Sequence, residues 1–376
     1  MPEIPRARVA WIAALPVLAI PLLAQSGDQK KLNLTTGKDV FLAACVGCHG
    51  SDGKGAPDTT AGFTKPGTFP DFSDCRGTTP ELDADWKATI HDGGLARGFS
   101  RIMPSFSEAL TSEQIDMVVE YLRGLCKDQS WPRGELNFPR AMFTEKAFPE
   151  SEAVITTNTN AQGAPGTTGE LDYEYEFGVH NQLEVAVPFG FTHDQNRWLG
   201  GMGDLGIGVK RVLFSSLHTG SILAVEGLVN LPTGDKSKGL GNGTTSFETF
   251  AAFDQRLPAQ SFVQFQAGGV LPTHTRTTPD SAYWRAAFGK SFREDHGMGR
   301  MWTPITELIA NRNWMTGAKS DYNVVPQFQV TLSRRQHIAA DVGVSVPVND
   351  RAGRPVQVVF YLLWDWFDGG FLEGWK

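Results

Sequence analysis

A regular alternation of apolar and polar residues over the C-terminal half most constrains the fold of this 376-residue chain. Between 171 and 179, every second residue is apolar, and the intervening Asp172, Glu174 and Glu176 are acidic. Successive side chains of a β-strand point to opposite faces, so the pattern predicts a strand with one apolar and one acidic face. About twelve such runs follow one another, near 152–159, 171–179, 183–191, 204–214, 221–231, 246–257, 261–271, 282–293, 301–312, 321–333, 337–347 and 355–366.

The length and spacing of these runs are typical of a β-barrel of the bacterial outer membrane. The connections between the runs are alternately short and long, and bacterial barrels have short periplasmic turns and longer outer loops. The sequence therefore predicts an antiparallel transmembrane barrel of about 12 strands over 151–376, with both chain ends in the periplasm. A soluble β-sandwich also alternates and is the competing interpretation. Pro188 and Pro326 fall inside predicted strands, where they indicate bulges.

Two segments of this half resemble outer-membrane channel proteins associated with transport in aromatic-degradation pathways. They are GDLGIGVK at 203–210 and LPTGD at 231–235. The resemblance covers most of 170–376 and implies the barrel fold more than any particular cargo. The glycines near 200–208 do not indicate a nucleotide site, because no βαβ unit accompanies them.

The N-terminal half carries a motif of a different kind, CVGCH at 45–49. Two thiols two residues apart, followed directly by a histidine, form the attachment pattern of c-type haem. Cys45 and Cys48 would bond covalently to the haem vinyl groups, and His49 would become an axial ligand of the iron. The sequence therefore predicts one covalently bound haem c.

A second axial ligand is predicted at Met103, in a Gly- and Arg-rich loop and followed by Pro104. A thioether opposite the histidine completes low-spin haem and raises its reduction potential. His91, in a polar segment, is an alternative ligand. Met117 is a further alternative, although its place on a predicted helix fits a core position.

Helices are predicted at 37–44 and from a capping box at Thr111 to Gly124. With these helices, CVGCH and Met103, residues 34–127 resemble the class I mono-haem cytochrome c family. The resemblance implies an all-α domain, and it places Pro57 against the proximal histidine and Trp86 near the haem propionates.

Iron with both axial positions filled has no site for substrate, so we expect one-electron transfer rather than catalysis. No catalytic constellation is evident in the second half of the chain. The protein is therefore expected to be an electron carrier, and direct oxidation of a metal ion or a small molecule is left open.

Residues 1–24 read as a secretory signal peptide, with Arg6 and Arg8 before a short apolar run. An uncleaved N-terminal anchor is the alternative. Export agrees with covalent haem attachment, which occurs outside the cytoplasm, and it permits disulfides. Cys75 and Cys126 are accordingly predicted to form a bridge, with two buried free thiols as the alternative.

The remaining features are less specific. Residues 128–150 read as a semi-rigid linker, because their proline-containing pairs break regular structure. The net charge of −7 and the absence of a Lys/Arg block argue against a nucleic-acid partner. His193 and His274, with Asp194, lie in predicted outer loops, either as solvated residues or in contact with metal ions. The acidic face at 172–176 would line the lumen and set a cation preference.

The overall plan is similar to that of fused cytochrome–porins, but the haem segment is longer and the barrel is smaller. Twelve strands enclose a narrow lumen, and a domain of about 100 residues has a radius of gyration near 13 Å, so the haem domain should lie in the periplasm. We therefore expect an electron carrier anchored in outer-membrane lipid, whose redox partner is a protein, a small redox-active molecule or a metal ion. One alternative is a channel whose tethered cytochrome accepts electrons from a periplasmic dehydrogenase, and another is a barrel that serves only as an anchor.

Overall fold

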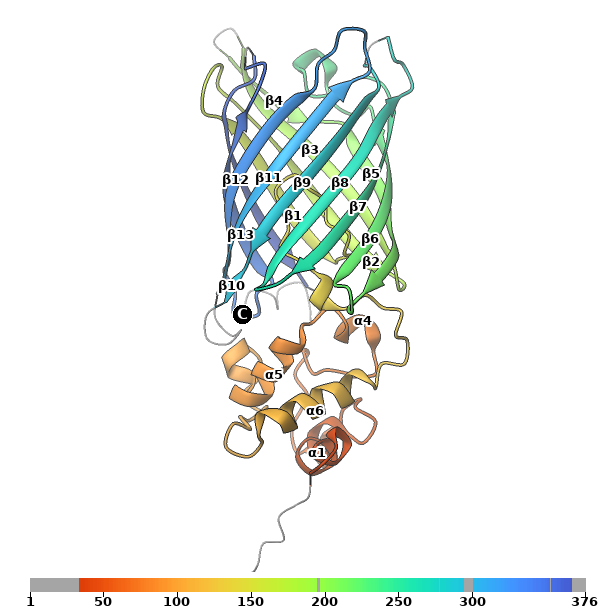
Figure 1. Cartoon of the computed structure of the whole chain (residues 1–376), viewed down its shortest axis with the longest axis vertical. Coiled ribbons are helices and arrows are strands. Elements are labelled where there is room, and N and C mark those ends of the chain that lie inside the picture. The colour runs from red at the N-terminus through yellow and green to blue at the C-terminus, as the bar shows by residue number, and fades with distance from the viewer. Residues whose placement is uncertain (1–33, 195–196, 277, 294–299, 352, 367–376) are drawn as a thin grey trace, which may run out of the picture. The chain divides into compact units, whose positions relative to one another are not determined.

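The computed structural model describes residues 34–366 apart from 195–196, 277, 294–299 and 352. The predicted signal peptide, 1–24, lies outside the described residues. From residue 34 onward the chain forms one compact unit, with short helices followed by strands (Figure 1). None of the helices in the described part is long and apolar enough to cross a membrane.

Residues 34–136, the first described part of the chain, contain the helices. Its elements are α1 (Gly37–Ala44), α2 (Val46–His49), α3 (Asp58–Ala61), α4 (Cys75–Thr78), α5 (Asp83–Asp92), the 3₁₀ turn η1 (Gly94–Arg97), α6 (Ser112–Arg123) and the 3₁₀ turn η2 (Gly134–Leu136). The predicted capping box is present, because Thr111 accepts from the amide of Gln114 and the Gln114 side chain accepts from the amide of Thr111.

Helices α1 and α6 cross closely and form the core of the helical domain. A Cβ at Gly37 would lie 1.9 Å from the carbonyl oxygen of Met117, so only glycine allows this approach. Val40 and Phe41 of α1 are fully buried against the apolar face of α6, which includes Val118. The helix pair therefore fixes the start of α1 against the middle of α6.

A disulfide joins Cys75, at the start of α4, to Cys126, just after α6. It closes a segment with a sequence separation of 51 residues. Such a bridge stabilises a fold mainly by restricting the unfolded chain. The two other cysteines, Cys45 and Cys48, are not disulfide-bonded.

The second part of the chain is a single antiparallel sheet. Its strands are β1 (Glu152–Asn160), β2 (Gly166–Phe177), β3 (Asn181–Asp194), β4 (Arg197–Met202), β5 (Leu205–Ser216), β6 (Ser221–Leu231), β7 (Ser246–Leu257), β8 (Ser261–Pro272), β9 (Ser281–Lys290), β10 (Phe292–Arg293), β11 (Met301–Asn313), β12 (Asp321–Thr331), β13 (Ile338–Pro347) and β14 (Gln357–Asp365). A short 3₁₀ turn, η3 (Lys236–Lys238), lies between β6 and β7.

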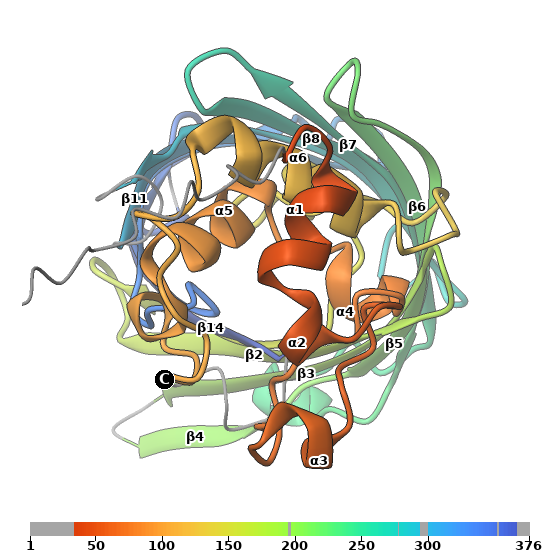
Figure 2. The same ribbon diagram turned by 90° about the horizontal axis from the view of Figure 1, so that it is seen from below.

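The sheet closes on itself, because β1 pairs with both β2 and β14. Strands β4 and β5 pair in succession with β3, and β9 and β10 pair in succession with β11, so each couple is one interrupted strand. The result is a closed antiparallel barrel of twelve strands, which appears as a ring in Figure 2. The predicted fold class is confirmed.

The two strand prolines have different effects. Pro188 of β3 lies opposite the break between β4 and β5, at 203–204. The register of β3 with β5 is shifted by one residue relative to its register with β4, so Pro188 lies beside a bulge, as predicted. Pro326 lies in a gap of the β12–β13 ladder, but the register is the same on both sides of the gap. The missing proline N–H therefore interrupts pairing there without adding a residue, and no bulge forms.

The outer surface of the barrel is apolar and its interior is polar. Outward side chains include Ile155, Tyr173, Val209, Phe265, Phe328 and Phe360, each at least 40% exposed. Buried inward side chains include Glu174, Gln182, Lys210, Asp254, Gln264 and Glu307, each 0% exposed. A soluble sandwich would bury the apolar face instead, so this arrangement excludes it. A closed barrel with an apolar exterior is what a lipid bilayer requires.

The two ends of the barrel differ. Consecutive strands are joined at one end by the short turns 178–180, 217–220, 258–260 and 332–337, and we call this the short-turn end. The opposite end carries longer segments, including 232–245 and 348–356. This is the alternation expected from the sequence.

Candidate functional site

The helical domain contains a mainly apolar cavity of about 440 Å³ that is open to the surface. Cys45, Cys48, His49, Met103 and Trp86 all line it, so the structure brings together five of the predicted cofactor-binding residues. Pro57, also predicted, is the N-cap of α3 and does not line the cavity.

The local fold of the CVGCH segment places its three reactive side chains on one turn. The amides of Cys48 and His49 both donate to the carbonyl of Cys45, at 3.2 and 3.0 Å. Gly50 ends the helix with a φ of +71°, a conformation that favours glycine. The amide of Ala56 then donates to the carbonyl of Cys48 at 2.8 Å, which ties the following loop to the turn.

The environment of His49 suits an iron ligand. Its ring lies 5.0 Å from the rings of both Phe69 and Phe72. Burial lowers the pKa of His49 to about 4, so the imidazole is neutral at physiological pH and keeps a lone pair for a metal. Its buried Nδ1 has no hydrogen-bond partner among the described residues.

The two thiols are half-buried and are not disulfide-bonded. Burial, followed by the neighbouring Cys48, raises the pKa of Cys45 to about 11, so Cys45 is a neutral thiol. Two thiols that face an apolar cavity beside a neutral imidazole match the attachment chemistry of haem c.

Met103 reaches the cavity because the chain after α5 folds back on itself. The amide of Gly94 donates to the carbonyl of Met103 at 3.0 Å. A Cβ at Gly94 would lie 2.4 Å from the carbonyl oxygen of Ser100, so a side chain there would prevent the fold-back. The Met103 side chain packs against the same core as α1 and α6.

The two alternative ligands are placed elsewhere. His91 is half exposed, pairs with Asp92 at 2.8 Å and does not line the cavity. Met117 lies on α6 and does not line the cavity either. The geometry therefore favours Met103 as the residue opposite His49.

Arg123, which contacts the cavity-lining Trp86, was not predicted from the sequence. The Arg123 guanidinium lies 3.9 Å from the centre of the Trp86 ring. It also donates to Asp83 at 2.7 Å and to the carbonyls of Thr78 and Glu81. An arginine in the last turn of a helix is common and gives no signal in the sequence.

The barrel lumen forms a second candidate site, because residues 138–150 lie inside it. We call this segment the inward loop. The loop is attached to Glu307 of β11, whose carboxylate accepts from the amides of Met142, Phe143 and Thr144 and from the Thr144 hydroxyl. The shortest of the amide contacts is 2.7 Å. The sequence suggested a linker at 128–150, and this part of it is a structural component of the barrel.

Ion pairs attach the inward loop to the wall. Arg140 pairs with Glu152 of β1 at 2.9 Å and with Glu174 of β2 at 2.5 Å. Lys210 of β5 pairs with Glu145 of the loop at 2.9 Å. These charges are buried, so each requires its partner.

A polar cavity of about 400 Å³ is bounded on one side by the inward loop. Its lining includes Glu170, Asp172, Glu184, Glu248 and Arg285. Asp172, Glu174 and Glu176, whose acidic face was expected to line the lumen, are each at most 5% exposed. The lumen is therefore polar and acidic, and the inward loop fills part of it.

The helical domain contacts the short-turn end of the barrel. Arg76 donates to the carbonyl of Glu176 at 3.0 Å, and Arg335 donates to the carbonyl of Gly98 at 3.1 Å. Glu176 and Arg335 both lie at or beside short turns. The helical domain therefore contacts the barrel at its short-turn end.

The histidines predicted in the outer loops are not brought together. His193 stacks edge-on against Trp198 with the ring centres 5.3 Å apart, and Nδ1 of His274 lies 3.1 Å from the Thr244 hydroxyl. The side chain of Asp194 lies outside the described part. In the part of the chain that is described, both clusters of potential metal ligands consist of glutamates.

Comparison with known proteins agrees with this division of the chain. Residues 34–125 match the family model "Cytochrome c". No curated protein matches the sequence. The chain therefore joins a cytochrome c domain to a closed twelve-stranded barrel.

Solved structures similar to the chain include both kinds of protein. An outer membrane channel from Pseudomonas putida F1 is 12% identical, with a TM-score of 0.42, and the match covers 61% of this chain and 100% of that one. The KdgM porin is 8% identical, with a TM-score of 0.39 and coverage of 57% and 99%. The KustC0563 c-type cytochrome is 27% identical, with a TM-score of 0.21 and coverage of 24% and 99%.

Proposed function

We propose that this protein is a haem c electron carrier anchored in the bacterial outer membrane. Its cytochrome domain lies on the periplasmic side and exchanges single electrons with a redox partner, which is a protein, a small redox-active molecule or a metal ion. The observation that carries the proposal is the cavity that both thiols, His49 and Met103 line together.

One haem would be held through thioether bonds to Cys45 and Cys48, with His49 and Met103 as axial ligands. The haem would supply reversible one-electron chemistry. The protein residues would keep the imidazole neutral, supply the thioether and exclude water through the surrounding Phe69, Phe72 and Trp86. Because both axial positions would be filled, we expect no catalysis on a bound substrate.

The barrel supports the membrane part of the proposal through its own surface. The outward face of the barrel is apolar and the inward face is charged. A barrel with this arrangement is stable when lipid surrounds it and polar groups fill its interior. Arg76 and Arg335 join the cytochrome domain to the short-turn end of the barrel. These contacts support a periplasmic position for the domain, because bacterial barrels have their short turns in the periplasm.

A second candidate function is an outer-membrane channel whose tethered cytochrome serves a periplasmic dehydrogenase. The polar cavity of about 400 Å³ favours it. The inward loop opposes it, because Glu307 and Lys210 hold that loop across the lumen.

The test uses sealed proteoliposomes that contain the haem-loaded protein with the cytochrome domain inside. A membrane-impermeant reductant, ferrous ion among those tried, is added outside, and haem absorbance is followed together with leakage of the reductant. Haem reduction without leakage supports electron transfer through the barrel to the cytochrome. Equilibration of small solutes with the haem still oxidised supports the channel, and an impermeable barrel with oxidised haem supports an anchor that serves only periplasmic partners.

A further inference from the structure

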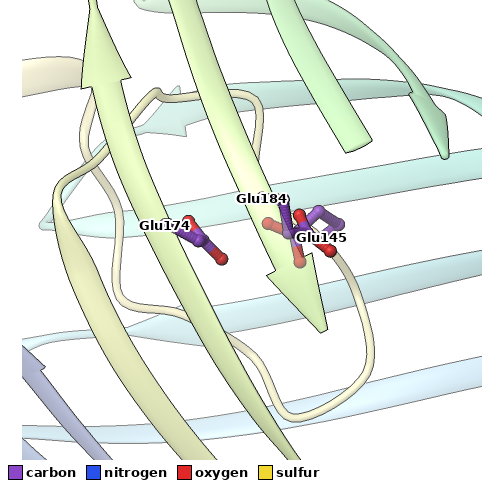
Figure 3. Close-up of side chains that lie close together, drawn as sticks. All are labelled: Glu145, Glu174 and Glu184. Carbon is purple, nitrogen blue, oxygen red and sulfur yellow. The ribbon is translucent and has the colours of Figure 1, made fainter. Parts of the chain in front are cut away.

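Three glutamates meet where the inward loop contacts two neighbouring strands. Glu174 of β2 and Glu184 of β3 are directly opposite each other in the sheet, and Glu145 comes from the loop (Figure 3). One carboxylate oxygen of each residue lies within 4.8 Å of one from each of the others. Oxygens at this separation can share one cation, whereas three bare carboxylates would repel one another.

Two of these carboxylates each have a buried oxygen that accepts no hydrogen bond from a donor in the described structure. Glu174 is 0% exposed, and its Oε2 has no hydrogen-bond partner among the described residues. Oε2 of Glu184 is also buried and lacks a partner in that part of the chain. Figure 3 shows the Glu174 carboxylate directed toward the other two. A buried carboxylate oxygen without a donor is costly, so the geometry points to a missing positive partner.

The charges around the cluster do not balance. Arg140 and Lys210 hold the two oxygens of Glu145 at 3.1 and 2.9 Å, and Arg140 also pairs with Glu174. Glu184 has no ion pair with either base among the interactions of the described residues, and Glu226 of β6 acts on it as a further negative neighbour. Glu226 lies within hydrogen-bond reach of Glu184, and neither of its buried oxygens accepts from a donor in the described structure. Lys146 also acts on Glu145, but it is paired with Glu150 and Glu152. The two bases in contact with the cluster therefore face four carboxylates, and the difference equals the charge of one divalent cation.

We propose that Glu145, Glu174 and Glu184 bind one divalent cation inside the barrel. Ligands that are all carboxylate oxygens select hard ions such as Mg²⁺, Ca²⁺ or Mn²⁺ rather than thiolate- or imidazole-seeking metals. Each carboxylate oxygen has two lone pairs, so Glu145 can keep its contacts with Arg140 and Lys210 while it binds the ion. The ion would join the inward loop to β2 and β3. This site goes beyond electron transfer and does not depend on it.

The test measures Mn²⁺ binding to the full-length, haem-loaded protein in detergent, with the haem kept oxidised and no electron donor present. Electron paramagnetic resonance reports free Mn²⁺. We expect one Mn²⁺ per chain, displaced by Ca²⁺. Glu184→Gln removes one ligand charge and should weaken binding by about tenfold or more.

Glu248→Gln is the matched control. Glu248 lines the same polar cavity and accepts from the Tyr283 hydroxyl at 2.5 Å, but it is not one of the three clustered glutamates. Its removal should change the Mn²⁺ affinity by less than about twofold, since it lies outside the proposed site. Equal loss in both variants would show only diffuse attraction to an acidic lumen and would overturn the site, as would the absence of stoichiometric binding to the wild type.

A second measurement keeps the proposal testable if Glu184→Gln does not fold. Crystals of the wild-type protein grown with Mn²⁺ would give an anomalous scattering peak. A peak between Glu145, Glu174 and Glu184 supports the proposal, and a peak elsewhere, or none, contradicts it. Both measurements are made without electron transfer, so their failure is distinct from a failure of the proposed function.

Discussion

The surroundings of His49 and Met103 give both side chains the properties that axial ligands of a haem iron require. Burial keeps the His49 imidazole neutral, and the fold-back at Gly94 brings Met103 to the same cavity. Neither property is produced by the motif alone. The first depends on the aromatic residues around the histidine, and the second depends on a glycine that allows close backbone approach.

Replacement of Met103 by leucine tests its assignment as an axial ligand. Leucine has nearly the same volume but no thioether, so packing should be kept while the haem iron loses a ligand. We expect a lower reduction potential and a new ability to bind added imidazole. Potentiometric titration and absorbance spectroscopy of the haem-loaded protein measure both.

Met117→Leu is the control, because Met117 lies on α6 outside the cavity. Its potential and its spectrum should match those of the wild type. The assignment would be wrong if Met117→Leu, rather than Met103→Leu, opened the iron to imidazole.

The sequence predicts the strands well but does not predict the inward loop. The runs predicted at 221–231 and 246–257 have the bounds of β6 and β7, because each strand separates lipid from lumen and must alternate at every residue. The inward loop has no such periodicity. It is held through backbone amides that donate to Glu307, and backbone donors are the same in every sequence.

The candidate sites divide in the same way. Covalent attachment requires the residue types of CVGCH at fixed spacing, so this motif could be recognised in the sequence. Met103 was predicted from its loop and the following Pro104, and the structure shows it in the lining of the same cavity. The glutamate cluster could not be recognised, because Glu145 is far from Glu174 and Glu184 in the sequence and only the entry of the loop into the lumen unites them. Pro57 was assigned by resemblance, and in this chain it lies outside the cavity lining.

Substitution of Glu307 by alanine should release the inward loop. Three donors of Phe143 and Thr144 would lose their acceptor, and the Met142 amide would keep only its longer contact with Gln327, so these amides should exchange their hydrogens faster. Because the loop occupies the lumen, single-channel conductance in planar bilayers should rise. Hydrogen exchange followed by mass spectrometry measures the first effect directly.

Gln264→Ala provides the comparison. Gln264 also faces the lumen and is 0% exposed, but its side-chain amide makes no hydrogen bond among the described residues. This variant should leave exchange at 142–144 and conductance unchanged. If the two variants behave alike, Glu307 is not what holds the loop.

The molecule as a whole joins a helical domain with a buried apolar core to a barrel with the opposite distribution of apolar and polar side chains. Its polar groups are enclosed and its apolar groups are outside, so the surrounding lipid is part of what stabilises it. The helical domain contacts the short-turn end through Arg76 and Arg335. Because lipid surrounds the wall but not the loops, a charged substitution on the outer wall should lower the free energy of unfolding more than the same substitution in a loop.

Val209→Arg tests this inversion. Val209 lies in the middle of β5, faces outward and is 46% exposed. Near the bilayer midplane, arginine on a lipid-facing position costs about 2–4 kcal/mol. Urea unfolding in lipid vesicles, followed by tryptophan fluorescence, should show a loss of this size.

Met315→Arg makes the same kind of change in the long segment after β11, where the side chain is 55% exposed. Its cost should be about 0–1 kcal/mol, as expected away from the hydrocarbon. Equal destabilisation by the two arginines would contradict a membrane location for the barrel wall.

The inward loop also determines where this chain can be cut into independently folding pieces. A fragment that starts at the first strand, near 151, would lack Arg140 and Lys146, and Glu152 and Glu174 would remain buried without their partners. A fragment that starts before η2, at about 130, would keep every attachment of the loop to the wall. The strands alone are therefore not the smallest autonomous unit, and a barrel expressed by itself needs the preceding twenty or so residues to fold.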